Sequence, residues 1–334
     1  MRILLTGGLG FIGSHVAVTL GQSDENDIVI VDNLMNSTMD VLHHIKSLVK
    51  FPENVHFMEG DVLQESDLEK VFITYPNIDS VIHFASLKAV GESVEKPLLY
   101  YRSNLTGILN VLTIMKQFNC NRFVFSSSAT VYGNDAPSPL FETDQVGTSI
   151  TNPYGQTKYF QEQILMDYSK TEPEMDITIL RYFNPVGAHS SGLIGENPTG
   201  IPNNLFPYIL RVASGQYADI RIFGDDYDTN DGTGVRDFIH VADLAEGHVA
   251  ALNHMTHGIS IYNLGSGKGS SVMELIKTFE RVNGVEIPFV IADRREGDVA
   301  TTFADSTKAF DILGWKTTRT MEDICRDGYN FVMK

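Results

Sequence analysis

The alternation of short apolar runs with helical patterns constrains the fold of this chain more than any other feature of its sequence. Strands are expected at residues 2–6, 27–31, 55–59, 80–84, 122–126 and 177–182. Helices are expected at residues 13–20, 66–74, 97–118 and 157–169. Apolar strands that alternate with helices are typical of a parallel sheet with helices on both faces. The sequence therefore predicts an α/β fold with a Rossmann-type, doubly wound parallel sheet.

Charge and composition narrow the class of protein. The formal net charge is −17, which argues against nucleic acid and anionic membranes as partners, because both are bound mainly through clustered Lys and Arg. No apolar run reaches about 18 residues, and strand-like residues begin at Ile3, so neither a membrane span nor a signal peptide is expected. Cys120 and Cys325 are far apart, which fits a reducing compartment. We therefore expect a cytoplasmic protein without a nucleic-acid or membrane partner.

The histidines give no pattern of metal ligands. All ten are scattered along the chain. The adjacent pair His43-His44 lacks the one-turn spacing that places two ligands on one face of a helix. No metal site is expected.

Three glycines lie between the first expected strand and the helix that follows it: Gly7, Gly10 and Gly13. Such a turn leaves the N–H groups of the helix free to bind the pyrophosphate of a dinucleotide. The second strand ends at Asp32, about where a carboxylate would accept from the adenosine ribose 2′-hydroxyl. Because that carboxylate would repel a 2′-phosphate, NAD is favoured over NADP. The alternative is a tight turn that binds no ligand.

Tyr154 and Lys158 are spaced for proton transfer. If the segment is helical, the two side chains lie one turn apart on the same face, so an ammonium group can hold its charge near a phenol. That charge favours the phenolate, and a tyrosine whose pKa is lowered in this way can act as a base near neutral pH. Together with the glycine turn, this pair predicts hydride chemistry.

Polar residues follow three further strands, at the edge where parallel sheets bind ligands. Asp61 comes after the third strand and is placed to meet the adenine, although an aspartate in a surface turn is the simpler interpretation. Residues 83–86 follow the fourth strand. The run Ser126-Ser127-Ser128 follows the fifth, where a hydroxyl could reach the phenolate or could merely satisfy backbone groups.

Several longer segments of the sequence resemble those of the extended short-chain dehydrogenase/reductases, and of the UDP-glucose 4-epimerases among them. The quoted segments are Thr6-Gly-Gly-Leu-Gly-Phe-Ile-Gly-Ser14, Phe84-Ala-Ser-Leu-Lys-Ala-Val-Gly-Glu-Ser93, Ser126-Ser-Ser-Ala-Thr-Val-Tyr-Gly133, Asn152-Pro-Tyr-Gly-Gln-Thr-Lys158, Arg181-Tyr-Phe-Asn-Pro-Val-Gly-Ala188, Gly200-Ile-Pro-Asn-Asn-Leu205, Ile222-Phe-Gly224 and Asp231-Gly-Thr-Gly-Val-Arg-Asp-Phe-Ile-His-Val-Ala-Asp-Leu244. The similarity spans essentially the whole chain, and the last segment is highly specific. It implies an isomerase that interconverts UDP-glucose and UDP-galactose.

The resemblance also implies catalytic roles for three residues. Tyr154 would take the proton from the sugar 4-hydroxyl, Lys158 would hold the nicotinamide ribose and lower the tyrosine pKa, and Ser128 would hydrogen-bond the reacting oxygen. Hydride would pass from C4 of the sugar to NAD. The 4-keto sugar, still anchored by UDP, would turn over and take the hydride back on its other face.

The cofactor-binding residues implied by the resemblance are Gly7, Gly10, Phe11, Ile12, Gly13, Asp32, Asn33, Leu34, Met35, Asn36, Ser37, Asp61, Val62, Phe84, Ala85, Ser86, Leu87, Lys88, Ser103, Ser128, Tyr154, Lys158 and Phe183. Two of these residues differ from those that relatives carry at the same positions. Ser86 replaces a glycine that is common in relatives. Ser103 stands where some relatives carry Asn, and the neighbouring Asn104 is retained, so either residue could reach the cofactor.

The substrate-binding residues implied by the resemblance are Lys88, Ser128, Tyr154, Asn184, Asn204, Leu205, Phe223, Arg236, Arg295, Asp298 and Thr302. Arginines suit a diphosphate because the guanidinium fork binds phosphate oxygens in pairs, and Asp298 can accept from a ribose hydroxyl. The simpler interpretation of either Arg236 or Arg295 is a solvated surface charge.

Thr302 bears on substrate range. Relatives restricted to glucose and galactose often carry a bulky tyrosine there, whereas relatives that accept N-acetylated sugars carry a smaller residue. Thr302 therefore suggests a second activity, the interconversion of UDP-GlcNAc and UDP-GalNAc. The alternative is that threonine leaves a water-filled gap.

Two rival functions fit the same fold. A nucleotide-sugar 4,6-dehydratase would carry a Thr-Asp-Glu triplet after the fifth strand, whereas this chain has Ser127-Ser128-Ala129 there, without acids. A non-catalytic NAD-sensing protein would have lost the tyrosine and lysine pair, which is present here.

The length of 334 residues suggests two domains at about 150 residues each. We expect an NAD-binding Rossmann domain at 1–182, to which residues 237–252 return, and a smaller C-terminal α/β domain at 183–334 that binds the UDP-sugar. By resemblance, the expected helices at 97–118 and 157–169 would pair across a two-fold axis in a homodimer. Their apolar residues would equally fit a core.

Overall fold

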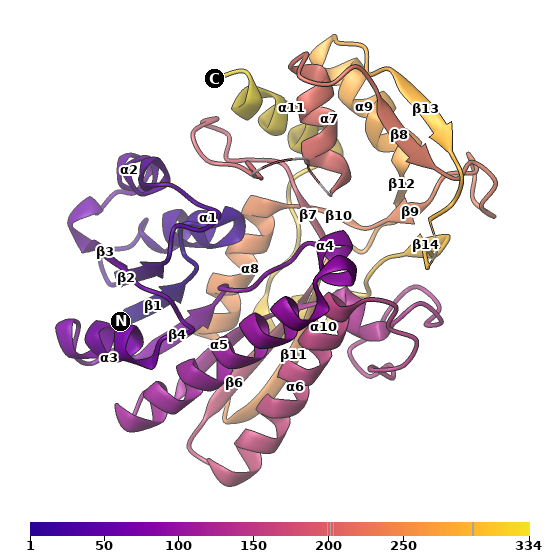
Figure 1. The fold of residues 1–334 in the computed structure, drawn as a ribbon. Helices are drawn as coiled ribbons and strands as arrows, with labels where there is room; N and C mark the ends of the chain where they lie inside the picture. Colours follow the sequence, from indigo (N-terminus) through magenta and orange to yellow (C-terminus); the bar gives the residue numbers. More distant parts are fainter. Residues whose placement is uncertain (199, 201, 203, 296) are drawn as a thin grey trace.

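The computed structural model describes the chain except for residues 199, 201, 203 and 296. Its main element is a parallel sheet of seven strands (Figure 1), in the order β11-β6-β5-β4-β1-β2-β3. The strands are β1 (Arg2–Thr6), β2 (Asp27–Asp32), β3 (Val55–Glu59), β4 (Ser80–His83), β5 (Arg122–Ser128), β6 (Asp176–Tyr182) and β11 (Gly258–Leu264). This order is that of a Rossmann-type doubly wound sheet with one added strand. The predicted fold class is confirmed.

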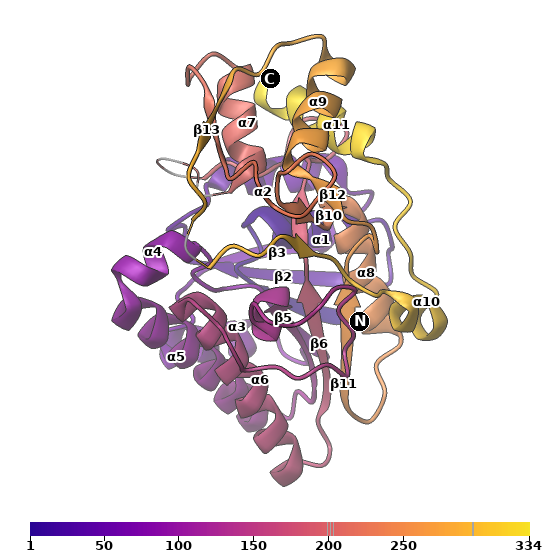
Figure 2. The same cartoon turned by 90° about the vertical axis from the view of Figure 1, so that its right-hand side faces the viewer.

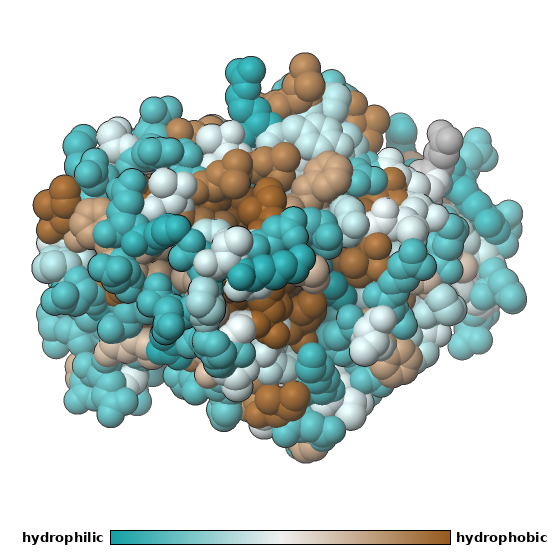
Figure 3. Space-filling view, turned by 90° about the horizontal axis from the view of Figure 1, so that it is seen from below, coloured by the Kyte–Doolittle hydropathy of each residue, from teal (hydrophilic) through white to brown (hydrophobic). Residues whose placement is uncertain are grey.

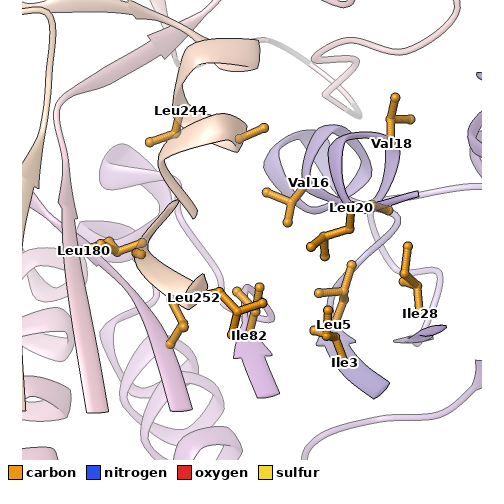
Figure 4. Close-up of a cluster of buried hydrophobic side chains, with 14 of the residues drawn as sticks. Ile3, Leu5, Val16, Val18, Leu20, Ile28, Ile82, Leu180, Leu244 and Leu252 are labelled. Carbon is orange, nitrogen blue, oxygen red and sulfur yellow. The ribbon is translucent and has the colours of Figure 1, made fainter. Parts of the chain in front are cut away.

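Helices cover both faces of the sheet. One face packs against α1 (Phe11–Leu20), α2 (Met39–Leu48) and α8 (Val241–Asn253). The other packs against α3 (Glu65–Thr74), α5 (Pro97–Gln117) and α6 (Pro153–Thr171). Figure 4 shows the first of these layers, in which Leu5 and Ile82 of the sheet face Val16 of α1 and Leu252 of α8.

The start of α6 matters most for the site. Pro153 occupies the first turn, where its missing N–H costs nothing, and the side chain of Asn152 accepts a hydrogen bond from the Gly155 N–H at 2.8 Å. These two features start the helix four residues before the expected position. Tyr154 therefore lies in the first turn of α6, in register with Lys158.

The rest of the chain forms a second core of small sheets and helices, at the top of Figure 1 and turned toward the viewer in Figure 2. Its helices are α7 (Leu205–Ala213), α9 (Val272–Asn283) and α11 (Met321–Val332), which share the apolar cluster around Phe206 and Phe279. Its strands are β7 (Asn184–Val186), β8 (Ile220–Phe223), β9 (Val235–Arg236), β10 (Phe238–His240), β12 (Ser270–Ser271), β13 (Phe289–Ala292) and β14 (Thr301–Thr302). The short helices α4 (Val90–Glu95) and α10 (Thr307–Leu313) lie outside this core.

The chain returns to the first sheet over a longer stretch than expected. Helix α8 packs on α1, as the expected return of residues 237–252 requires. Strand β11 then pairs with β6 from Gly258 to Leu264, although the expected division gave these residues to the second domain. The return therefore extends to the end of β11, because that strand needs the edge of the large sheet to satisfy its backbone groups.

The face of the molecule drawn in Figure 3 is mostly hydrophilic. Figure 3 shows hydrophobic residues in separate groups among more numerous hydrophilic ones on one face. Among the described helices, none is both long and apolar enough to cross a bilayer.

Candidate active site

The glycine turn after β1 is packed closely against its neighbours. Gly7 has φ +68, and a Cβ there would lie 2.8 Å from the backbone nitrogen of Ala85, in the loop after β4. A Cβ on Gly13 would lie 2.7 Å from the Gly7 carbonyl oxygen. Glycine is needed at both positions because any side chain would push the turn away from the sheet or from α1.

The N-terminus of α1 fits an anion. Its N-cap is Gly10, which supplies no side-chain hydrogen bond, and its first turn carries no acidic residue. The N–H groups of Phe11 and Ile12 in that turn have no intrahelical partner, and the helix dipole favours negative charge there. The turn therefore fits the pyrophosphate of a dinucleotide.

Asp32 organises the neighbouring loop. One carboxylate oxygen accepts from the Leu9 N–H at 3.0 Å, and the other accepts from the Leu34 N–H at 3.0 Å and the Ser37 hydroxyl at 2.8 Å. The Asn33 amide donates to Asp61 at 3.2 Å. The residues predicted to surround the adenosine thus lie together at the ends of β2 and β3; Met35, with 61% exposure, lies at the rim.

Asn104 fixes the loop after β4. Its side chain accepts from the Leu87 N–H at 2.9 Å and donates to the Leu87 carbonyl at 3.1 Å and the Thr157 hydroxyl at 3.0 Å. Its polar atoms are therefore used in joining the loop to α6. Of the two neighbours, Ser103 is the one whose hydroxyl makes no hydrogen bond within the described residues, which favours it as the cofactor contact.

The three predicted catalytic residues come together. Ser128 is the last residue of β5, and its side chain lies close enough to the Tyr154 hydroxyl of α6 to lower the pKa of that tyrosine. Lys158 is 4% exposed, and its Nζ donates to the Ser126 carbonyl at 2.8 Å and lies 5.9 Å from the centroid of the Tyr154 ring. A phenol, a hydroxyl and an ammonium group therefore converge at the carboxyl edge of the sheet.

The expected lowering of the Tyr154 pKa is wrong for the protein alone. Burial raises the pKa of Tyr154, and the interaction with Ser128 opposes this only in part. Burial also lowers the pKa of Lys158 to about 7, although the charge of the Glu162 carboxylate raises it. The effect of burial on the Tyr154 pKa outweighs the effect of the Lys158 charge, because Lys158 donates its hydrogen bond to Ser126 and not to the phenol.

The sequence analysis missed two charged residues beneath the site. Glu162 and Arg181 are 0% and 1% exposed and form a bidentate ion pair, with bonds of 3.0 and 2.8 Å. The spacing of Glu162, one turn beyond Lys158, was a usable signal. Arg181 opens a segment already quoted for its resemblance.

The predicted diphosphate residues gather on small strands and the loop between β13 and β14. Arg236 of β9 and Thr302 of β14 are register partners. Arg295 binds Asp298 at 2.8 Å and lies 4.8 Å above the ring of Phe223. Burial lowers the pKa of Arg236, and Asp298 opposes that shift. Five predicted residues therefore form one cluster.

Contacts connect this cluster to the catalytic segment. Asn134 donates to the carbonyl of Gly297, and a Cβ on Gly297 would lie 3.2 Å from the Thr151 hydroxyl, just before α6. The Ser138 hydroxyl donates to the Thr301 carbonyl at 3.3 Å. The strand that carries Thr302 is thereby held beside the loop after β5.

Two further predicted substrate residues, Lys88 and Asn204, contact Glu196, which the sequence analysis also missed. Its carboxylate binds Lys88 at 2.5 Å and Asn204 at 3.4 Å, and it is 8% exposed. Asn184 is exposed at the start of β7, and Leu205 is partly buried at the start of α7. Residues 201 and 203 of the quoted segment 200–205 lie outside the described residues.

Phe183, another predicted cofactor residue, packs into an apolar cluster. It is 6% exposed and belongs to a small apolar cluster with Val131, Tyr132, Leu140 and Ala304. Its prediction as a neighbour of the nicotinamide stays a prediction. No group of three or more potential metal ligands occurs within the part of the chain that the structure describes.

Residues 3–265 match the model of the NAD dependent epimerase/dehydratase family, and the chain belongs to this family. Within it, the chain is similar over its whole length to UDP-glucose 4-epimerases. That of Erwinia amylovora is 51% identical over 99% of this chain and 97% of the relative. The structure of the Bifidobacterium longum enzyme in complex with NAD+ and UDP is 48% identical, with a TM-score of 0.95 over 100% of this chain and 98% of that one. The UDP-Glc/GlcNAc 4-epimerase of Campylobacter jejuni is 33% identical, with a TM-score of 0.86 over 99% of each chain.

These findings confirm the resemblance, the prediction of an epimerase and NAD as its cofactor. They favour the epimerase over both rival functions. The residue-by-residue roles stay predictions, because the comparisons give no contacts for individual side chains.

Proposed function

We propose that this chain interconverts UDP-glucose and UDP-galactose. The observation that carries the proposal is the convergence of Tyr154, Lys158 and Ser128 at the carboxyl edge of the sheet, beside a glycine turn that fits NAD. NAD, when bound, supplies the hydride acceptor and donor. Within that site the phenolate of Tyr154 takes the proton of the sugar 4-hydroxyl, Ser128 donates to the same oxygen, and Lys158 keeps a positive charge beside the phenolate.

The substrate cluster explains how one site can act on both faces of a sugar. Arg236 and Arg295 hold the diphosphate, and Asp298 holds the uridine ribose, while the hexose itself is bound less tightly. The 4-keto sugar then turns about its pyrophosphate link without leaving. Tyr154 returns the proton to the 4-oxygen, and the cofactor ends each cycle in its starting state.

The first experiment incubates the purified protein with UDP-galactose, without added NAD, and follows UDP-glucose by chromatography. Conversion is expected, because a cofactor that is regenerated in each cycle can stay bound. If UDP-galactose is not converted even after NAD is supplied, the proposed epimerase activity is wrong, and the 4,6-dehydratase and NAD-sensing alternatives return.

A second substrate pair is proposed on the strength of Thr302. This residue is the register partner of Arg236 in the small sheet, and its small side chain would leave more room for an acetamido group than a tyrosine would. A relative named for UDP-Glc and GlcNAc has the same fold over its whole length. We infer that UDP-GlcNAc and UDP-GalNAc are also interconverted.

Replacing Thr302 by Tyr tests this inference. Turnover of UDP-GalNAc should fall about 100-fold relative to that of UDP-galactose, the order of discrimination that a steric change in a pocket gives. Thr301→Tyr is the matched control, because successive side chains of a strand point to opposite faces, and it should leave the ratio of the two turnovers unchanged. Equal loss on both substrates in Thr302→Tyr would contradict the inference.

The assembly and location belong to the same proposal. A groove of about 510 Å³ between α5 and α6 is lined mainly by apolar atoms of Leu109, Leu112, Thr113, Lys116, Gln117, Ile164 and Tyr168. Leu98, also on α5, is 81% exposed. These helices support a homodimer that buries the groove. We also propose a cytoplasmic location and two domains divided near residue 182, with a return of the chain to the first domain through β11. Light scattering of the purified protein should give the mass of a dimer.

A further inference from the structure

Three polar residues form a row across the sheet, one residue before the catalytic edge. Ser127 of β5 is the register partner of Arg181 of β6, and Arg181 is the partner of Asn263 of β11. All three are at most 1% exposed. Buried polar groups in the middle of a sheet are costly unless they are paired, so this row requires partners.

Glu162 of α6 is the main partner of the row. Its carboxylate accepts two hydrogen bonds from the Arg181 guanidinium, at 3.0 and 2.8 Å, and a third from the Ser127 hydroxyl. The Arg181 guanidinium also donates to the Tyr132 hydroxyl at 3.0 Å, which in turn donates to Asn263 at 2.7 Å. The row therefore joins β5, β6, β11 and α6 in one buried network.

The same face of α6 carries the catalytic residues. Tyr154, Lys158 and Glu162 follow one another at intervals of one turn. Each meets a different residue at the end of β5: Tyr154 meets Ser128, Lys158 donates to the Ser126 carbonyl, and Glu162 accepts from Ser127. The Glu162 contact is thus the one furthest along α6 from the catalytic edge. Together the three contacts between α6 and β5 set the distance between the phenol and Ser128.

The network also sets the charge around Lys158. The groups that face the ammonium are Tyr154 and Glu162 on α6 and His83 on β4, and His83 is buried and neutral because burial lowers its pKa to about 3. Glu162 is thus the negative charge of this group, and Arg181 partly compensates it. Removing Glu162 makes the field at Lys158 more positive, whereas removing Arg181 makes it more negative.

We propose that Glu162 is a positioning residue of the active site, which fixes the end of β5 against α6 and keeps Lys158 in its ammonium form, with Ser127 and Arg181 holding its carboxylate. This inference rests on the proposed function, because it concerns the same catalytic residues. Glu162 itself does not reach the substrate.

The test compares Glu162→Gln with Arg181→Met. The titration of Lys158 is followed by NMR of protein labelled with 13C-lysine, and Lys158→Met identifies its signal. In Glu162→Gln the ammonium loses its counter-charge and keeps the Arg181 charge nearby, so Lys158 should titrate at lower pH than in the wild type. In Arg181→Met the carboxylate is uncompensated, so Lys158 should titrate at higher pH.

Activity provides a second readout. Because the ammonium form is the active one, activity is lost as pH rises through the lysine titration. This loss should move to lower pH in Glu162→Gln, with kcat at pH 8 about 10-fold below the wild type, and to higher pH in Arg181→Met. Asp243→Asn is the matched control: it breaks another ion pair, between the buried Asp243 of α8 and the partly exposed Arg319, and should lower the unfolding temperature without moving the Lys158 titration.

The outcomes separate this inference from the proposed function. If the wild type converts no UDP-hexose, the proposed function fails, while the NMR titration still tests the charge of Glu162. If both variants titrate as the wild type does, the inference is overturned. Should either variant not fold, Ser127→Ala decides: it keeps both charges, and a kcat reduced about threefold or more at unchanged KM supports positioning, whereas wild-type kcat refutes it.

Discussion

The two halves of the site differ in how their side chains are held. On the catalytic side, Lys158 is 4% exposed, and its partner is a backbone carbonyl of the sheet. On the substrate side, the Arg295 side chain is 55% exposed, and its partner is Asp298, three residues along the same loop. The first half is therefore fixed by the core, whereas the second is held by contacts that a diphosphate must compete with.

The difference follows from the elements that carry each half. The predicted catalytic residues lie at the end of β5 and on the first turns of α6, which has 19 residues and packs along the sheet. The substrate cluster lies on strands β9 and β14, each of two residues, and on the loop that precedes β14. Long packed elements hold side chains in one position, so chemistry should depend on the first half and affinity on the second.

The largest effect should come from Tyr154→Phe. This change removes the proton acceptor and keeps the ring that packs near Lys158, so kcat should fall by about 10²–10⁴-fold, the usual contribution of a general base. KM and the unfolding temperature should stay close to those of the wild type. Steady-state kinetics with UDP-galactose and a thermal melt measure both. A kcat within tenfold of the wild type would mean that another group takes the proton.

Arg236→Gln should act on affinity instead. Arg236 lies in the small sheet and, within the described residues, donates to the carbonyl of its neighbour Val235 and to no carboxylate. It is therefore free to bind a phosphate, and its loss should raise KM about 10–100-fold, since a hydrogen bond to a charged group contributes about 1.5–3 kcal/mol. Arg221→Gln, an exposed arginine of β8, is the control and should leave KM unchanged. A fall in kcat without a rise in KM would break the distinction between the two halves.

The sequence marks the elements of the predicted catalytic half more plainly than those of the substrate half, although the roles of its residues stay predictions. Tyr154 and Lys158 are four residues apart, and the helix that aligns them is marked locally by Asn152 and Pro153. Ser128 ends a strand whose apolar pattern is plain. These signals are local, and local sequence patterns predict the folded structure well when the helices and strands that carry them are long.

What the sequence analysis missed depends on contacts between distant segments. Arg181 is 19 residues from Glu162 along the chain, and its register partner Asn263 lies 82 residues beyond Arg181. The raised pKa of Tyr154 could not be predicted either, since spacing reveals the ammonium group but not the burial that outweighs it. Strand β11 joins an edge that only the assembled sheet provides.

The smallest effect should come from Arg295→Gln, and it sharpens the comparison most. Arg295 must leave Asp298 before it can bind a phosphate, so its new contact is offset by the loss of an old one. Exposed ion pairs contribute about 0.2–1 kcal/mol and are screened by salt, so KM should rise only about two- to fivefold, and less at 0.5 M NaCl than at low salt. Asp298→Asn gives the complementary measurement, because it frees Arg295 while retaining a hydrogen-bonding side chain. If Arg295→Gln instead raised KM as much as Arg236→Gln does, at every salt concentration, the substrate half would be as firmly organised as the catalytic half, and side-chain exposure would be a poor guide to which residues bind.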